Sequence, residues 1–230
     1  MQYFSQQGKK KSIVKWVTEI KSFETYSWLK KLHYAKRIPC ISYAFGLYLH
    51  NDLIGIVTYG SPPSLSLCIG ICGEQFKDKV IELNRLCLID NHKNNASFLV
   101  GNSLKLLPKP KIVVSYADTS MNHTGYIYQA TNFIYTGLSN KRTEWRIKNS
   151  NMHSKTICEK YTLQERMNDK DKFEVVDRPR KHRYIYFLGN KKEKKEFLNN
   201  LKYQIEPYPK TQNKNYQIDH KVSTQLIMQM

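Results

Sequence analysis

Residues 80–118 read VIELNRLCLIDNHKNNASFLVGNSLKLLPKPKIVVSYAD and carry the strongest structural signal in the chain. Residues 80–90 have the apolar content of a strand, and residues 96–107 space their apolar side chains at helical intervals before Pro108. Residues 111–118 are mostly apolar and β-branched, which is typical of a buried central strand. A strand, a helix and a second strand in this order predict an α/β sheet with a right-handed crossover.

The flanking segments extend this sheet in both directions. Asn51 and Asp52 form a polar break between two apolar runs, which indicates a hairpin. The expected elements are a helix at 24–37, strands at 42–50 and 53–60, an irregular loop at 61–76, a helix at 123–132, and strands at 133–137 and 182–188. We expect one domain over residues 1–190 and a basic, lysine-rich C-terminal tail over residues 191–230. The fold class is therefore α/β, a mixed central sheet flanked by helices.

Composition narrows the class of protein. The 230 residues carry 37 Lys and Arg against 19 Asp and Glu, a formal net charge of +18, and the aromatic content of 12% supplies enough buried surface to exclude disorder throughout. No run approaches the roughly 20 apolar residues of a membrane span, and no secretory leader is evident. Five scattered cysteines favour reduced thiols and a cytoplasmic protein. The positive charge favours nucleic acid over a membrane as partner.

Two segments could hold chemistry in such a sheet. The loop before the helix at 96–107 contains Asn94, Asn95 and Ser97, which either cap that helix or bind phosphate through its first-turn N–H groups. The strand at 111–118 ends at Asp118, and Asn122, His123 and Tyr128 follow. They either form an active-site rim, because ligands bind at strand carboxyl ends, or cap a turn and pack in the core.

Other charged and polar positions leave alternatives open. Arg85 lies inside an apolar strand, so it either pairs with Asp118 or Glu82 or faces a cleft. His33 and Tyr34 could be surface residues. Cys68 and Cys72 lack a second matching pair, so a structural zinc site is not expected and both are interpreted as loop thiols. Lysine runs are commonly solvated, whereas Arg, His and Tyr interleave in residues 178–184, a mixture suited to phosphate contact and base stacking.

Seven collinear segments between residues 33 and 187 resemble the Mom family of phage DNA-modification proteins. They are HYAKRIP (33–39), ISYAFGL (41–47), PPSLSLCIGICG (62–73), ELNRLCL (82–88), SYADTSMNHTGYIYQATNFIYTGLSNKRTEW (115–145), HSK (153–155) and RPRKHRYIYF (178–187). The resemblance implies a GNAT-like acyltransferase fold and an enzyme that converts adenine in double-stranded DNA to N6-(carbamoylmethyl)adenine, hiding phage DNA from host restriction in the host cytoplasm.

The resemblance also implies site residues. Acetyl-CoA would lie between splayed strands, near Leu86, Leu88, Asn94, Asn95, Ser97 and Asn122, although the glycine-rich signature of GNAT enzymes is missing. The catalytic candidates are Asp118 as base or substrate-orienting carboxylate, Tyr128 as proton donor, Arg85 holding Asp118 or a negative intermediate, and His33, Tyr34 and His123. His and Tyr are suitable iron ligands, so His33 and Tyr34 are metal candidates. The expected DNA contacts are Lys141, Arg142, Lys155, Arg180, Lys181 and Arg183.

Two other functions remain open from the sequence. One is an ordinary acetyl-CoA-dependent N-acetyltransferase that acts on an amine of protein, RNA or a small molecule. The other is a DNA-binding protein that shields sites by occupancy and catalyses nothing. The carbamoylmethyl product contains a nitrogen that an acetyl group lacks, so the family's chemistry differs from simple acetyl transfer.

Overall fold

A computed structural model describes residues 14–90, 92–150, 152 and 154–210. Its centre is a seven-stranded sheet in the order β1-β2-β3-β4-β5-β9-β6. The strands are β1 (Lys15–Glu19), β2 (Tyr43–Leu49), β3 (Asp52–Gly60), β4 (Val80–Leu88), β5 (Lys111–Asp118), β6 (Ile134–Leu138) and β9 (Lys181–Leu188). Only β4 and β5 pair in parallel, and the other neighbouring strands are antiparallel. The expected mixed sheet with flanking helices is confirmed.

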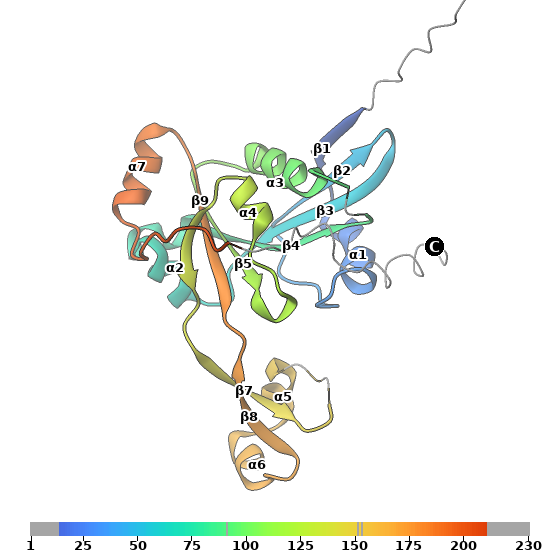
Figure 1. The fold of residues 1–230 in the computed structure, drawn as a ribbon, viewed down its shortest axis with the longest axis vertical. Coiled ribbons are helices and arrows are strands. Elements are labelled where there is room, and N and C mark those ends of the chain that lie inside the picture. Colours follow the sequence, from blue (N-terminus) through green and yellow to red (C-terminus); the bar gives the residue numbers. More distant parts are fainter. Residues whose placement is uncertain (1–13, 91, 151, 153, 211–230) are drawn as a thin grey trace, which may run out of the picture.

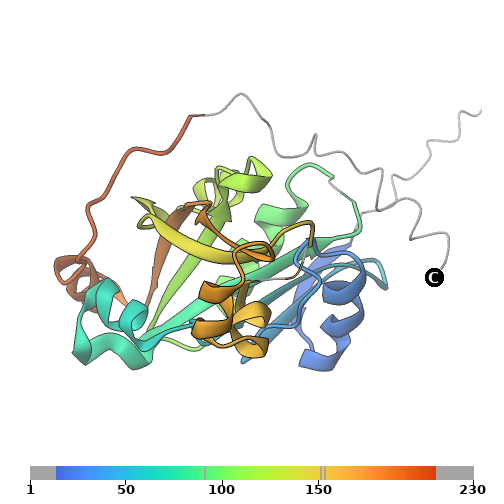
Figure 2. The same ribbon diagram turned by 90° about the horizontal axis from the view of Figure 1, so that it is seen from below.

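Helices cover both faces of the sheet (Figures 1 and 2). On one face, α3 (Asn95–Leu106) and α4 (Tyr126–Ala130) contribute to the larger core cluster, in which Leu99, Val113 and Phe133 are fully buried. On the other face, α1 (Tyr26–Lys31), α2 (Leu65–Cys72) and α7 (Lys191–Asn199) complete two smaller clusters. Because Ile112 and Val114 belong to the second face and Val113 to the first, β5 is buried on both sides, as its continuous apolar run predicts.

Several expected boundaries differ from the structure. The first helix is shorter, a 3-10 turn η1 (Ser22–Thr25) followed by α1, and it stops at Lys31. The segment expected to be a loop contains α2 and the 3-10 helix η2 (Glu74–Lys79), because the Ser64 side chain accepts a hydrogen bond from Leu67 N–H and starts a helix after two prolines. Cys68 and Cys72 are consequently buried on α2 and are not loop thiols.

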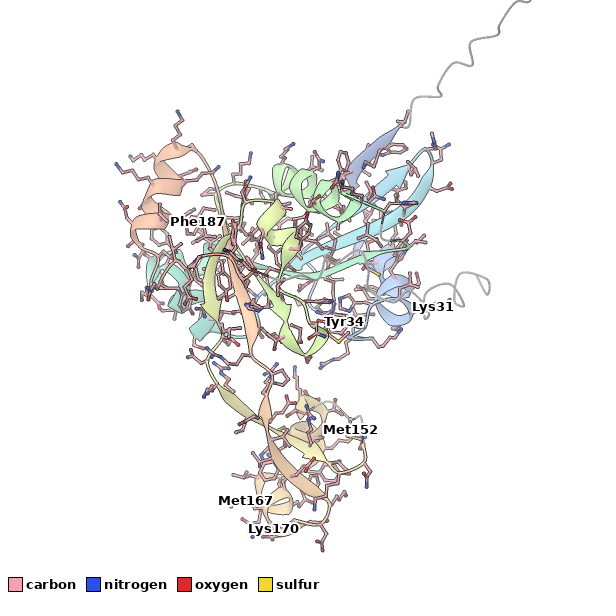
Figure 3. The ribbon with its side chains drawn as sticks, viewed as in Figure 1. Lys31, Tyr34, Met152, Met167, Lys170 and Phe187 are labelled. Atoms are coloured by element: carbon pink, nitrogen blue, oxygen red, sulfur yellow. The ribbon has the colours of Figure 1, made fainter. Side chains whose placement is uncertain are left out.

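A small arm extends from the main sheet, visible below it in Figure 1. It consists of the antiparallel pair β7 (Arg142–Ile147) and β8 (Phe173–Arg178), with α5 (Ser154–Lys160) and α6 (Leu163–Asn168) between them. Figure 3 labels Met152, Met167 and Lys170 on this arm. The sequence interpretation found no strand here, because alternation of Glu, Arg and apolar residues gives only a short two-sided ribbon.

The beginning of the expected tail packs on the sheet. Phe197 of α7 is buried against Phe76 and Phe187. After α7, the chain returns over the core: Lys202 N–H donates to the Ile71 carbonyl and Glu206 N–H to the Tyr135 carbonyl, at 2.9 and 3.0 Å. Residues 211–230 of the expected tail lie outside the described residues. Within the described residues, no helix combines the length and the hydropathy that a bilayer crossing requires.

One glycine at the end of β3 has no room for a side chain. A Cβ at Gly60 would overlap the carbonyl oxygen of Cys40, a backbone atom that cannot swing away. Gly60→Ala is therefore expected to lower the free energy of unfolding by about 1–3 kcal/mol. Gly101→Ala, inside α3, meets only Thr131 at 3.9 Å and is expected to stabilise by about 0.5–1 kcal/mol. Urea denaturation of both variants measures the difference; equal stabilities would contradict the close approach at Gly60.

Candidate active site

The parallel strands β4 and β5 pair over only a short stretch before they diverge. Val80 to Leu83 pair with Ile112 to Ser115, and beyond these positions β4 continues to Leu88 without a partner on that side. A register shift against β3 falls beside Asn84 and further bends β4. The gap between the diverging strands is a cleft of about 360 Å³, which we call the strand cleft. Its walls include His33, Tyr34, Glu82, Arg85, Leu86, Leu88, Ala96, Tyr116, His123, Tyr128 and Lys181.

A second cleft lies on the α2 side of the sheet, at the base of the arm. It has a volume of about 410 Å³, and its walls include Ser64, Ser66, Glu82, Tyr116, Arg142, Arg178, Lys181, Arg183 and Tyr203. We call it the basic cleft. Glu82, Tyr116 and Lys181 line both clefts, so the two cavities share one wall.

Glu82 is the acidic group of that shared wall. Burial raises the pKa of its carboxyl to about 7, against the opposing positive charges of Arg85 and Lys181. A carboxylate with this pKa can accept and release a proton near neutral pH, which is the property of a general base. The sequence interpretation considered Glu82 only as a partner for Arg85; its position within an apolar strand next to Arg85 was the available signal.

Asp118 has different bonding from that expected of a base. Its carboxylate accepts from Ser120 N–H and Oγ, at 3.0 and 2.7 Å, and lies 2.9 Å from Lys181 Nζ. Burial alone would raise the pKa of Asp118, but the hydrogen bonds from Ser120 and Lys181 and the Lys181 charge outweigh it and lower that pKa. The carboxylate caps the turn η3 (Thr119–Met121), so it organises the loop, and its lowered pKa makes it a weaker base than Glu82.

Arg85 does not hold Asp118, since Lys181 occupies that role. Arg85 Nη1 donates to the Asn84 carbonyl at 2.6 Å, and its Nε is buried without a hydrogen-bond partner in the part of the chain that the structure describes. Burial lowers the pKa of Arg85, with Tyr34 and Glu82 opposing. A buried N–H without a partner on the wall of the strand cleft fits a ligand with a carbonyl or anionic oxygen.

Tyr128 presents its phenol to the strand cleft. Burial raises its pKa to about 12, against the effect of a hydrogen bond with Ser115. Ser115 Oγ in turn donates to the Leu83 carbonyl at 2.9 Å, which fixes the pair at the point where the strands diverge. Tyr128 also packs against Phe133 and Tyr184. A phenol with this pKa keeps its proton at neutral pH and can donate it.

His33, Tyr34 and His123 meet at the open end of the strand cleft, and Figure 3 labels Tyr34 near the end of the main domain that faces the arm. The His33 and Tyr34 rings stack at 4.5 Å, and His123 meets Tyr34 edge-on at 6.3 Å. Burial, followed by the charges of Arg85, His123 and Lys36, lowers the pKa of His33 to about 4. His33 is therefore neutral at pH 7.

These donors do not fit an iron site. His33 Nδ1 accepts from Ala35 N–H at 3.0 Å, so the neutral ring carries its proton on Nε2 and neither nitrogen has a free lone pair for a metal ion. Among the described residues, no three His, Cys, Asp or Glu side chains come together as metal ligands.

The expected cofactor residues are only partly brought together. Leu86 and Leu88 line the strand cleft, and the first turn of α3 borders it through Ala96. Asn94 is left-handed and makes no side-chain cap, Asn95 accepts from Lys15 Nζ at 3.1 Å, and Ser97 Oγ donates to the Asn94 carbonyl at 3.2 Å. Asn122 lies outside the cleft walls, at the end of η3. First-turn N–H groups without a side-chain cap are suited to phosphate oxygens.

Some of the expected DNA contacts are exposed side chains, and others already form hydrogen bonds within the protein. Lys141 and Arg142 are exposed at the start of β7, and Lys155 is exposed on α5 with Glu159 3.8 Å away. Arg180 Nε donates to the Ser139 carbonyl at 2.6 Å. Arg183 is buried and donates to Thr136 Oγ1 and O, both at 2.9 Å, so it is a wall of the basic cleft and not a surface phosphate contact.

Comparison with known proteins gives one family. The model of the Mom protein family matches residues 15–210. The methylcarbamoylase Mom of Escherichia phage Mu is 29% identical over 187 residues, which cover 77% of this chain and 76% of that protein. Among solved structures, a putative acetyltransferase from Acinetobacter baylyi has a TM-score of 0.45 at 10% identity, covering 77% of this chain and 94% of its own. A Bacillus subtilis acetyltransferase in complex with CoA has a TM-score of 0.41 at 12% identity, with coverages of 77% and 100%.

Proposed function

Because the chain belongs to the Mom protein family, we propose that it modifies phage DNA, converting adenine to N6-(carbamoylmethyl)adenine in the double strand and so protecting that DNA from host restriction. The relative named a methylcarbamoylase supports the type of group that is transferred. The observation that carries the proposal is the position of Glu82, a carboxyl with a pKa near 7 in the wall between two clefts.

The strand cleft fits an acyl-coenzyme A donor. Beyond Leu83, the edge of β4 that faces β5 is unpaired, so its backbone can form hydrogen bonds with the amide groups of a donor. Among the described residues, Arg85 Nε has no hydrogen-bond partner. The N–H groups of the first turn of α3 can bind phosphate. Leu86, Leu88 and the turn at Asn94 to Ser97 would hold acetyl-CoA, a two-carbon thioester. Acetyl transfer alone would leave N6-acetyladenine, so the carbamoylmethyl group requires a nitrogen donor and a two-electron oxidant in addition to acetyl-CoA.

The residues around the cleft supply the proton chemistry. The exocyclic amine of adenine is a weak nucleophile because its lone pair is delocalised into the ring, so it needs a base as it reacts. Glu82 accepts that proton on its carboxylate. Tyr128 Oη is the proton donor on the opposite side, and Lys181 and Asp118 hold the rim of the site through their ion pair.

Nucleoside mass spectrometry tests the function. DNA from cells that express the chain should contain adenine with a carbamoylmethyl group, and DNA from cells that express an Asp118→Ala and Glu82→Gln double variant should not. An acetylated amine elsewhere with unmodified DNA would indicate an ordinary N-acetyltransferase. Unmodified DNA that is protected only while protein is bound would indicate a shielding protein. Either result contradicts the proposal.

Exposed cations at the base of the arm are expected to contact DNA phosphates. Lys141→Ala should weaken binding to duplex DNA and reduce the slope of log K against log salt by about one, because one fewer counterion is displaced. Lys195→Ala on α7, exposed on a different element, is the matched control and should keep the slope. Fluorescence anisotropy at several salt concentrations measures both; an unchanged slope in Lys141→Ala means that this edge does not contact DNA.

A further inference from the structure

The basic cleft has no function in the donor chemistry, yet it meets the strand cleft at Glu82. Its volume of about 410 Å³ is within the usual range of small-ligand sites, about 300–1,000 Å³. Its walls include aromatic rings and cations. Tyr116 and Tyr203 are the rings, and Arg142 and Arg178 are among the cations.

One wall of this cleft is a rigid flat surface. The Arg183 guanidinium carbon lies 3.3 Å from the centre of the Tyr203 ring. Two hydrogen bonds to Thr136 fix the guanidinium, and burial prevents it from leaving the ring. The stacked pair presents a planar face of the kind on which nucleobases stack.

The other walls suit a purine with an exocyclic amine. The Glu82 carboxylate accepts hydrogen bonds from an amine and repels a carbonyl oxygen, and the Ser64 and Ser66 hydroxyls can donate to or accept from ring atoms. Arg142 and Arg178 carry positive charge where the arm joins the main domain, which suits the phosphates on either side of an extruded nucleotide.

We propose that the basic cleft is the pocket for an adenine base extruded from duplex DNA, which stacks on Tyr203 and Tyr116 with its amine directed to Glu82. This assignment rests on the proposed function and specifies where the DNA substrate is held. The base then approaches the shared wall from the α2 side, and the activated donor approaches it from the strand cleft. Each substrate has its own entrance, and the two meet at one carboxylate.

Photo-crosslinking tests the assignment without requiring turnover. The probe is a duplex with a single unpaired 8-azidoadenine, because an unpaired base costs less to extrude. With the full chain, the crosslink should map to the peptide that contains Tyr203, which lines the basic cleft and not the strand cleft. Tyr203→Leu should reduce the crosslink yield by about fivefold to a hundredfold, the range expected for loss of one stacking face.

Two further variants separate stacking from folding. Tyr203→Phe keeps the ring and should crosslink as the parent does. Tyr208→Leu removes a tyrosine from the same C-terminal segment outside the cleft and should also keep the yield. Equal loss in Tyr203→Leu and Tyr208→Leu would show that only the segment's attachment matters and would overturn the proposal.

The outcome distinguishes this proposal from the function on which it rests. A crosslink to Tyr34 or Tyr128, or no crosslink from bound DNA, overturns the base pocket even where nucleoside mass spectrometry detects modified adenine. A crosslink to Tyr203 in a chain that leaves adenine unmodified supports the pocket and contradicts the proposed reaction.

Discussion

Glu82→Gln is expected to lower the rate constant of adenine modification by about 10²- to 10⁴-fold, the usual contribution of a general base. Glutamine has nearly the size of glutamate and can still accept a hydrogen bond, but its amide takes up no proton at neutral pH. The rate is measured as modified nucleoside formed under single-turnover conditions, with DNA and donor saturating, so that only the chemical step is compared.

The pH dependence provides an independent readout of the same group. The carboxyl acts as a base only when it is deprotonated, and burial raises its pKa to about 7. The rate constant should therefore rise about tenfold per pH unit below 7 and become constant above it. In Glu82→Gln, the rise of the rate constant with pH should disappear. Glu196→Gln, whose side chain is exposed on α7, should keep both the rate constant and its rise with pH. A rise that persists unchanged in Glu82→Gln assigns the titration to another group.

Tyr128→Phe is expected to reduce the rate constant by about 10²-fold or more while the protein stays folded. Phenylalanine preserves the packing against Phe133 and Tyr184 and removes only the hydroxyl that bonds Ser115 and donates the proton. Tyr126→Phe is the matched control, because Tyr126 lies on the same helix with its side chain exposed. Thermal unfolding accompanies the kinetic measurement. Full activity in Tyr128→Phe would remove this residue from the mechanism.

The sequence predicted the central part of the fold because local signals agreed there. The apolar run of β5, the helical spacing of α3 and the turn at Asn51 and Asp52 each specify one element without distant help. The arm was missed because β7 and β8 are short and rich in charged residues, and α2 was missed because Pro62, Pro63 and Gly70 are typical of loops.

The site was harder to predict, because its chemistry depends on strands that are distant in the chain. β5 pairs with β9 so that Asp118 lies opposite Lys181, and in this register Lys181 forms the ion pair with Asp118 that was one of the alternatives considered for Arg85. The pKa of Glu82 likewise depends on burial by elements that follow and precede it by many residues. Leu86, Leu88 and Tyr128 were expected at the site because of the resemblance to the family, and all three line the strand cleft.

The C-terminal segment that carries Tyr203 has a consequence for biosynthesis. The backbone N–H groups of Lys202 and Glu206 donate to the carbonyls of Ile71 and Tyr135. Tyr203, which is synthesised near the end of the chain, therefore completes the wall of a cleft whose other residues are synthesised earlier. A nascent chain that has emerged only as far as α7 has all seven sheet strands but an open side where Tyr203 belongs. In the proposed base pocket, one stacking wall is therefore completed only after all the sheet strands have been synthesised, and we expect a chain that stops before residue 203 to bind the extruded base more weakly.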